Sequence, residues 1–272
     1  MKIIYFSLII SFATLISCFS PSQAVDEIPV HQTFKIQSWK LSEVRTINVW
    51  TPNTYETTSD SLPVMYMGDG GIKEDFPHIA KTLAKLIQEK KIKPLILVGI
   101  ENTQRRRDLT GVTTVAKDKE IAPVVGESAK FRSFINDELF PEINKRFRTT
   151  IEKSIIGESL SGLFVVETFF LTPEMFDNYI AFDPSLWWNN HNLITTAKTN
   201  FNKFPAAKKR IWFAGSNTED ILPYTKALAA ILKKESKTNI QWKFSDEPTE
   251  KHETIFRATK EKAIVWTLSK TN

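Results

Sequence analysis

The residues best suited to chemistry in this chain lie in the stretch Gly157-Glu158-Ser159-Leu160-Ser161-Gly162. A serine flanked by small residues, between an apolar strand and an apolar helix, is typical of a nucleophile elbow, in which a tight turn presents the hydroxyl. We expect the strand at residues 154–156 and the helix at residues 163–170. Ser161 replaces the second glycine of the usual G-x-S-x-G pattern, and it is still a small residue. The alternative is an ordinary strand-to-helix loop that contains a serine.

A serine hydroxyl is a weak nucleophile at neutral pH and needs a neighbouring base. The sequence contains four histidines. His252 follows the last expected strand and precedes the final helix, which is the third place in the chain order nucleophile, acid, base. We therefore predict that His252 is the base. A helix-capping role is the alternative for His252, and His191, close to another strand end, is a rival base.

The base needs a carboxylate that fixes its tautomer and stabilises the imidazolium. Chain order places this acid after the strand at residues 210–214, where the loop 215–220 contains Glu219 and Asp220. We favour Glu219, with Asp220 as the other candidate. The carboxylate that is not used would complement the dipole of the following helix.

The transition state of acyl transfer needs hydrogen-bond donors for a developing oxyanion. One should be the backbone N–H of Leu160, which follows the candidate nucleophile. The other should come from the loop after the strand at residues 62–67, at Gly70 or Gly71. Glycine there permits close approach to a ligand, although a plain turn explains it equally well.

These residues need a framework that brings several strand ends together. Periodicity and turn residues predict strands at 32–40, 43–51, 62–67, 94–100, 154–156, 178–183, 210–214 and 239–245. Helices are expected at 77–91, 130–147, 163–170, 222–235 and 254–269. Residues 187–204 are expected to be helix and loop, and residues 101–127 a polar loop. After an antiparallel N-terminal hairpin, strands and helices alternate. This order predicts one α/β domain at residues 25–272, with a mostly parallel sheet covered by helices on both faces.

Composition restricts the partners. The chain is 42% hydrophobic and 25% charged, and its formal net charge is +5. This modest excess is compatible with an anionic substrate and does not indicate nucleic acid. The few histidines have no metal-ligand spacing, so we expect no metal and no cofactor.

The first 24 residues have the composition of a secretory signal peptide. Lys2 is followed by an uncharged run at residues 3–19, and Ala24 ends a small-residue cleavage site. We therefore expect export to the periplasm or beyond, with no stable membrane insertion after cleavage. Residues 15–18 also resemble a bacterial lipobox, so lipidation of Cys18 is the alternative. Cys18 is the only cysteine, and its removal would leave a mature protein without disulfides.

Several segments together resemble the putative-esterase family of α/β-hydrolases, which includes siderophore esterases, S-formylglutathione hydrolase and feruloyl esterases. The resemblance spans roughly residues 30–268 and is carried by LPVMYMGDG (62–70), GIENTQRRRDLT (99–110), IIGESLSG (155–162), AFDPSLWW (181–188) and KHE (251–253). It implies an α/β-hydrolase fold and ester hydrolysis through an acyl-enzyme, with Ser159 as nucleophile and His252 as base. The acid position is not clearly matched. Asp183 stands where the resemblance implies a serine, and Gly111 where it implies a proline.

The resemblance also suggests substrate contacts. Arg105 and Arg107 match family positions and would form an anion clamp, because guanidinium groups bind carboxylates and phosphates well. A solvated loop is the alternative. Trp187 and Trp188 would stack on an aromatic or sugar group, or else pack against the elbow.

The sequence thus predicts an exported serine carboxylesterase that acts on a small-molecule ester: a siderophore lactone, an acylated sugar or a small acyl ester. An acyltransferase on the same scaffold and a non-catalytic binding protein are the alternatives.

Overall fold

A computed structural model of the chain describes residues 26–122, 124–202, 204–235 and 238–269. The predicted signal peptide and Cys18 lie outside the described residues. The strands are β1 (Gln32–Ser38), β2 (Glu43–Trp50), β3 (Leu62–Met67), β4 (Ile96–Ile100), β5 (Thr149–Glu158), β6 (Asn178–Phe182), β7 (Lys209–Ser216) and β8 (Ile240–Glu247).

These eight strands form one sheet in the order β1-β2-β4-β3-β5-β6-β7-β8. The first hairpin is antiparallel and β2 joins β4 in the antiparallel direction, while every pairing from β4 to β8 is parallel. Strands β4 and β6 are buried along their whole length. Such continuous apolar strands are expected where helices cover both faces of a parallel sheet. The predicted fold class is confirmed.

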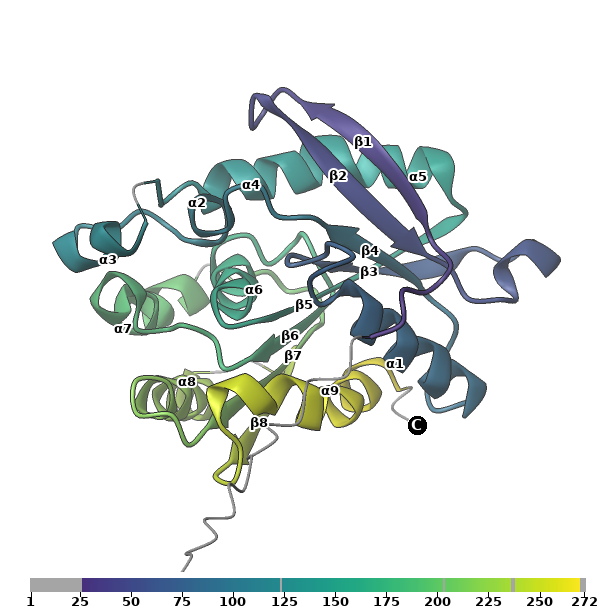
Figure 1. Cartoon of the computed structure of the whole chain (residues 1–272). Coiled ribbons are helices and arrows are strands. Elements are labelled where there is room, and N and C mark those ends of the chain that lie inside the picture. The colour runs from purple at the N-terminus through teal and green to yellow at the C-terminus, as the bar shows by residue number, and fades with distance from the viewer. Residues whose placement is uncertain (1–25, 123, 203, 236–237, 270–272) are drawn as a thin grey trace, which may run out of the picture.

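Helices cover the two faces of the sheet (Figure 1). The longer ones are α1 (Phe76–Gln88), α6 (Leu160–Leu171), α7 (Trp188–Asn202), α8 (Leu222–Glu235) and α9 (His252–Leu268). Helices α1 and α9 share one hydrophobic cluster with one face of the central strands. Helices α6, α7 and α8 belong to the cluster on the opposite face. None of the described helices is both long and apolar enough to cross a bilayer.

The segment between β4 and β5 is more structured than its polar sequence suggested. The expected loop contains two short helices, α2 (Arg105–Leu109) and α3 (Ala116–Ile121). The expected helix at 130–147 consists of α4 (Ser128–Phe134), a π-helical turn (Ile135–Leu139) and α5 (Phe140–Arg146). Pro141 is the second residue of α5 and lies just after the π-turn, whose wider backbone accommodates the missing N–H.

The parallel strands end at one edge of the sheet, which is where ligands bind in open α/β sheets. Strand β5 leads into α6 through Ser159, and β6 and β7 end beside it. Helix α9 begins at His252, a few residues after β8. The sheet therefore carries the candidate residues to a common edge from separate parts of the chain.

Candidate active site

Ser159 lies in a strained turn between β5 and α6. Its backbone has φ 57° and ψ −118°, a conformation that costs a non-glycine residue about 1–3 kcal/mol. Hydrogen bonds hold it in place: the Ser159 N–H donates to the Phe182 carbonyl at 3.0 Å, and the Ser159 carbonyl accepts from the Leu163 N–H at 2.8 Å. A Cβ atom at Gly157 would lie 2.4 Å from Oγ of Ser161, so only glycine permits this approach of strand and helix. The local geometry is that of a nucleophile elbow.

The structure brings Ser159 and His252 together across 93 positions of sequence. Nε2 of His252 lies 3.0 Å from Oγ of Ser159, within hydrogen-bond distance. The rival His191 is elsewhere, with its ring stacked on Tyr224 at 5.2 Å between centroids. Among the four histidines, His252 is thus the one that the described structure places in position to accept the Ser159 proton.

The carboxylate at the other ring nitrogen is Asp183, and the expectation of Glu219 or Asp220 in that place is wrong. Nδ1 of His252 lies 3.0 Å from Oδ2 of Asp183. Asp220 is near enough for its charge to contribute to raising the His252 pKa, yet its side chain and that of Glu219 are exposed. Chain order from nucleophile to acid to base is kept, but the acid follows β6 instead of β7.

Strand β7 supplies hydrogen bonds to the acid. The backbone N–H of Ser216 donates to Oδ1 of Asp183 at 2.6 Å, and the Ser216 hydroxyl donates to Oδ2 at 2.5 Å. The Asp183 side chain is completely buried, and a buried carboxylate is costly unless it is paired. The acid was expected after β7. Instead, Ser216 at the end of β7 bonds to Asp183, which follows the neighbouring strand β6. The sequence signal for Asp183 was its position directly after a buried strand.

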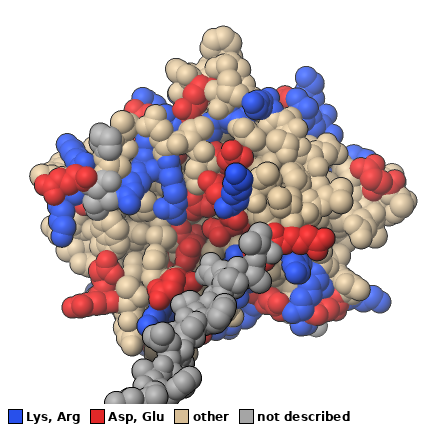
Figure 2. Space-filling model, in the orientation of Figure 1, with Lys and Arg blue, Asp and Glu red and all other residues tan. Residues whose placement is uncertain are grey.

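The pKa values at the site are displaced by these contacts. The hydrogen bond with Asp183 raises the pKa of His252, burial opposes this effect, and the charge of Glu158 adds to the increase. Burial raises the pKa of the Glu158 carboxyl to about 7, although the positive charge of His252 opposes the shift. Further acidic residues surround Glu158: Asp69, Asp75 and Asp183. Figure 2 shows acidic side chains gathered across the middle of one face, bordered by basic ones.

The two predicted oxyanion donors have different surroundings. Leu160 is the first residue of α6, and the N–H at that position has no partner within its helix. Gly70 is not available, because its N–H donates to the Ile100 carbonyl at 3.0 Å. The N–H of the alternative, Gly71, donates to Oε2 of Glu74 at 2.6 Å. Leu160 is therefore the predicted donor whose position suits the role.

The arginine pair predicted to clamp an anion is divided between two environments. Arg107 is buried, and its guanidinium is bonded to Glu43 and Asp108, so its assignment to substrate binding is wrong. Arg105 lies closer to the site, where its Nε and Nη2 donate to the two carboxylate oxygens of Asp69. Both arginines thus have carboxylate partners within the protein.

The tryptophan pair is also divided. Trp188 is buried, and its indole N–H donates to the Gly111 carbonyl at 2.8 Å. Trp187 is partly buried against the hydrophobic core. Packing therefore accounts for most of the Trp188 surface, while the remaining part lines a pocket beside α6. Substrate stacking by Trp187 stays a prediction.

Within the part of the chain that the structure describes, no cluster of three or more His, Cys, Asp or Glu side chains is arranged to hold a metal ion. What the described site offers is a hydroxyl, an imidazole and a carboxylate joined by hydrogen bonds. Such an arrangement can transfer a proton from the hydroxyl as it attacks an electrophilic carbon.

Comparison with known proteins identifies the family of the chain. The family model described as putative esterase matches residues 38–268, which is most of the chain. The chain belongs to the putative esterase family. It is similar to the ferri-bacillibactin esterase BesA of Bacillus subtilis, with 29% identity over 141 residues, 47% of this chain and 49% of that protein. It is also similar to the siderophore enterobactin esterase of Emericella nidulans, with 37% identity over 67 residues, 25% of this chain and 20% of that protein.

Solved structures extend the likeness over most of the chain. An IroE-like serine hydrolase from Shewanella oneidensis is 25% identical, with a TM-score of 0.80 over 87% of this chain and 79% of that one. The BES protein from Bacillus cereus shares the fold, with a TM-score of 0.78 and 20% identity over 93% of this chain and 100% of that one. The match to BesA, by contrast, spans about half the length of that relative. Family membership supports ester hydrolysis, and the resemblance inferred from the sequence motifs is confirmed.

Proposed function

We propose that this esterase is an exported serine carboxylesterase in which Ser159, His252 and Asp183 form the catalytic triad. The observation that carries the proposal is the continuous chain of hydrogen-bonding groups from Asp183 through His252 to Ser159, with 3.0 Å at each step. The strained turn at Ser159 keeps the hydroxyl at the carboxyl edge of the sheet, where an ester can reach it.

The reaction follows from these contacts. Nε2 of His252 accepts the Ser159 proton as Oγ attacks the ester carbonyl, and Asp183 stabilises the imidazolium. The Leu160 N–H donates to the developing oxyanion. The imidazolium then gives its proton to the leaving alcohol and leaves an acyl-enzyme. Water attacks the acyl-enzyme with His252 again as base, which releases the acid and restores Ser159.

The substrate class is proposed from the relatives. BesA and the Emericella nidulans relative are named as siderophore esterases, so we place a siderophore ester first and acylated sugars or small acyl esters after it. Comparing kcat/KM for an iron-loaded siderophore lactone, an acetylated sugar and p-nitrophenyl butyrate ranks the three. A lactone that is cleaved more slowly than both others would contradict the order.

The nucleophile is tested with Ser159→Ala. We expect p-nitrophenyl acetate and butyrate hydrolysis to fall by about 10⁵-fold or more, and labelling by a fluorophosphonate probe to disappear. Ser133→Ala, on α4 and far along the chain from the elbow, is the matched control and should keep both. Wild-type activity in Ser159→Ala would overturn the assignment.

Export is tested separately, because it depends on residues outside the described part of the chain. Removal of a signal peptide after Ala24 should give an intact mass that begins at Val25. A mass that begins at a lipidated Cys18 would instead show a lipoprotein, and an intact N-terminus in the cytoplasm would contradict export.

A further inference from the structure

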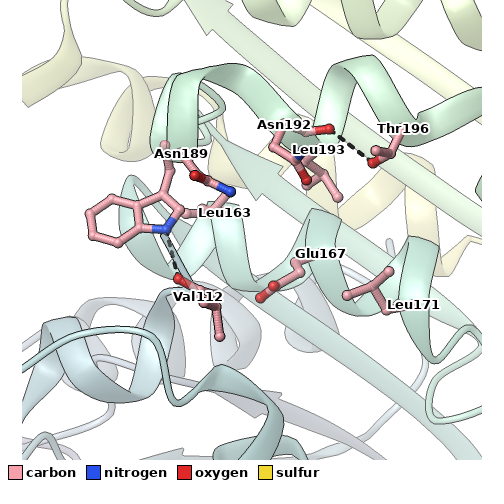
Figure 3. A pocket seen from close by; sticks show the side chains of 10 residues that line it. Val112, Leu163, Glu167, Leu171, Asn189, Asn192, Leu193 and Thr196 are labelled. Carbon is pink, nitrogen blue, oxygen red and sulfur yellow. Dashed lines mark hydrogen bonds between the residues drawn. The ribbon is translucent and has the colours of Figure 1, made fainter. Parts of the chain in front are cut away.

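A pocket lies beside α6, one to three helical turns beyond Ser159. It is lined on one side by Leu163, Glu167 and Leu171 of α6 and on the other by Trp188 and α7. Figure 3 shows Glu167 and Leu171 across from side chains of α7, with Val112 closing one end. The pocket leaves about 80 Å³ open to the centres of water-sized groups, against roughly 10–15 Å³ for one water. Several heavy atoms of a ligand can therefore enter it.

Backbone contacts connect this pocket to the reacting centre. The Leu163 N–H donates to the Ser159 carbonyl at 2.8 Å, so Leu163 is one turn from the candidate nucleophile. On the other wall, the Trp188 N–H donates to the Ser185 carbonyl at 3.1 Å, and Oγ of Ser185 is 3.4 Å from Oγ of Ser159. One lining residue of each wall is thus hydrogen-bonded to Ser159 itself or to Ser185, its neighbour in space.

The pocket is on the opposite side of the sheet from the helix that carries the base. Helix α9, which begins with His252, packs on the cluster that also holds α1, whereas α6 and α7 belong to the other cluster. His252 must protonate the leaving alcohol, so the alcohol part of the ester lies on the α9 side. The acyl part is then directed towards α6 and the pocket.

Glu167 gives this mostly apolar pocket one strong acceptor. Its Oε2 is paired with Nη1 of Arg132 at 3.0 Å, and both side chains are largely buried. Its Oε1 lies beside Gly111, where an added Cβ would be only 2.3 Å away. Since Arg132 already neutralises the charge, the oxygen at the pocket favours a neutral donor such as a hydroxyl over a cation.

The helix fixes the length of the acyl group. Glu167 is eight residues beyond Ser159, which is roughly 12 Å along an α-helix at 1.5 Å per residue. Helical side chains lean towards the N-terminus and shorten that gap. An acyl chain of about six carbons with a terminal hydroxyl spans this distance when the hydrogen bond is included.

We propose that this pocket is an acyl-binding subsite for an acyl chain with apolar methylenes and a terminal hydrogen-bond donor, which Glu167 accepts. The proposal rests on the proposed serine esterase function and specifies which esters that site prefers. Leu163 and Trp188 contact the methylenes, and Leu171, one turn beyond Glu167, closes the far end of the pocket. The Gly111 position stays open because a side chain there would meet the Glu167 carboxylate.

The test compares p-nitrophenyl 6-hydroxyhexanoate with p-nitrophenyl heptanoate, which has a methyl group in place of the hydroxyl. We expect wild-type kcat/KM to be about tenfold higher for the hydroxylated ester, the value of one good hydrogen bond to a charged acceptor. In Glu167→Gln this ratio should fall several-fold. Gly111→Ala, which keeps the carboxylate but displaces it, should also lower the ratio. Glu174→Gln, on the exposed end after α6, should leave the ratio unchanged.

The two levels of the proposal fail in different ways. If the wild type does not hydrolyse p-nitrophenyl acetate, whose acyl group is too short for the pocket, the serine esterase function is contradicted and the subsite with it. If the wild type cleaves acetate but shows no preference for the hydroxylated ester, only the subsite is overturned. The same holds if Glu167→Gln and Gly111→Ala both keep the wild-type preference. Thermal melts of each variant show whether it is folded.

Discussion

Arg105 and Arg107 are two residues apart, and they belong to clusters of opposite character. Arg107 is part of a buried ion network that we define as Glu43, Arg45, Arg107 and Asp108. In this network Arg45 donates to Glu43, Asp108 and the Glu101 carbonyl, and Arg107 donates to Glu43 and Asp108. Arg105 instead contacts Asp69 at the site, where its side chain is 36% exposed.

The two clusters use their charges differently. In the buried ion network, Nε of Arg45 is the one buried side-chain nitrogen or oxygen without a hydrogen-bond partner. At the site, burial raises the pKa of Glu158. The pKa of His252 is also raised, mainly by its hydrogen bond with Asp183. Burial opposes the shift, but hydrogen bonds from Arg107 and Arg45 lower the pKa of Glu43, so that this carboxylate stays ionised, whereas burial raises the pKa of Glu158 towards neutral pH. A pKa near neutral pH, together with partial exposure, marks a group that can exchange protons. The following changes test this distinction, from the largest expected effect to the smallest.

Asp183→Asn should have the largest effect. The amide cannot stabilise the His252 imidazolium and favours the wrong tautomer, so we expect kcat to fall by about 10³–10⁴-fold, as in serine proteases. Glu219→Gln and Asp220→Asn are matched controls that should stay within a few-fold of wild type. Single-turnover and steady-state kinetics with p-nitrophenyl acetate measure all three. A larger loss in either control than in Asp183→Asn would return the acid to the loop after β7.

The two arginines should differ in how much they contribute to the free energy of unfolding. Arg107→Gln leaves Glu43 and buried Asp108 poorly neutralised, and we expect the free energy of unfolding to fall by about 3–5 kcal/mol. Arg105→Gln removes a cation that is 36% exposed and leaves the buried Asp69 bonded to the Asn102 amide, so it should cost less, about 1–2 kcal/mol. Urea unfolding followed by fluorescence compares the two. Equal losses would mean that both arginines have the same structural role.

Ser216 should act by positioning Asp183. Ser216→Ala removes the hydroxyl bond to Oδ2 but keeps the backbone bond to Oδ1, so we expect kcat to fall by about tenfold with little change in KM. Ser216→Thr retains a hydroxyl and should recover most of the loss. A change confined to thermal stability, with an unaltered pH profile, would show that the bond is merely structural.

Glu158→Gln should give the smallest change, a displacement of the pH profile. The negative charge of Glu158 contributes to raising the pKa of His252, so its removal lowers that pKa. Because the reaction needs the neutral imidazole, activity is lost as pH falls through the His252 pKa. The acid limb of kcat/KM should therefore move to lower pH in Glu158→Gln, and not in Glu174→Gln. A shift to higher pH would contradict the sign of the interaction.

The sequence was sufficient for the parts of this structure that depend on local pattern. Alternating strands and helices predicted the sheet, and small residues around Ser159 predicted the elbow. Chain order predicted His252, whose ring the structure places 3.0 Å from the Ser159 hydroxyl. The same rule failed for the acid because order along the chain does not specify which strand end carries the carboxylate, and Asp183 keeps the order while changing the strand.

The other errors have a similar origin in three-dimensional placement. The expected loop contains α2, in which residues two apart point about 200° apart around the helix axis. Arg105 and Arg107 therefore face different surroundings although they are near neighbours in sequence. Gly70 was predicted from its loop, but whether its N–H is free depends on Ile100, a contact between strand ends that no local pattern encodes.

The position of Asp183 directly after β6 affects where the sequence of the protein can vary. Ser159 and Asp183 follow adjacent strands, and Ser216, the last residue of β7, bonds to Asp183. In the proposed triad Glu219 and Asp220 therefore have no part in proton transfer, and the bond from the Asn217 N–H to the Glu250 carbonyl ties the start of their turn to the segment before His252. Because Thr218 contacts the Ser216 hydroxyl and Ile221 is buried, variation should be tolerated at the exposed tip, Glu219 and Asp220, which makes these two positions suited to adapting the enzyme to new partners.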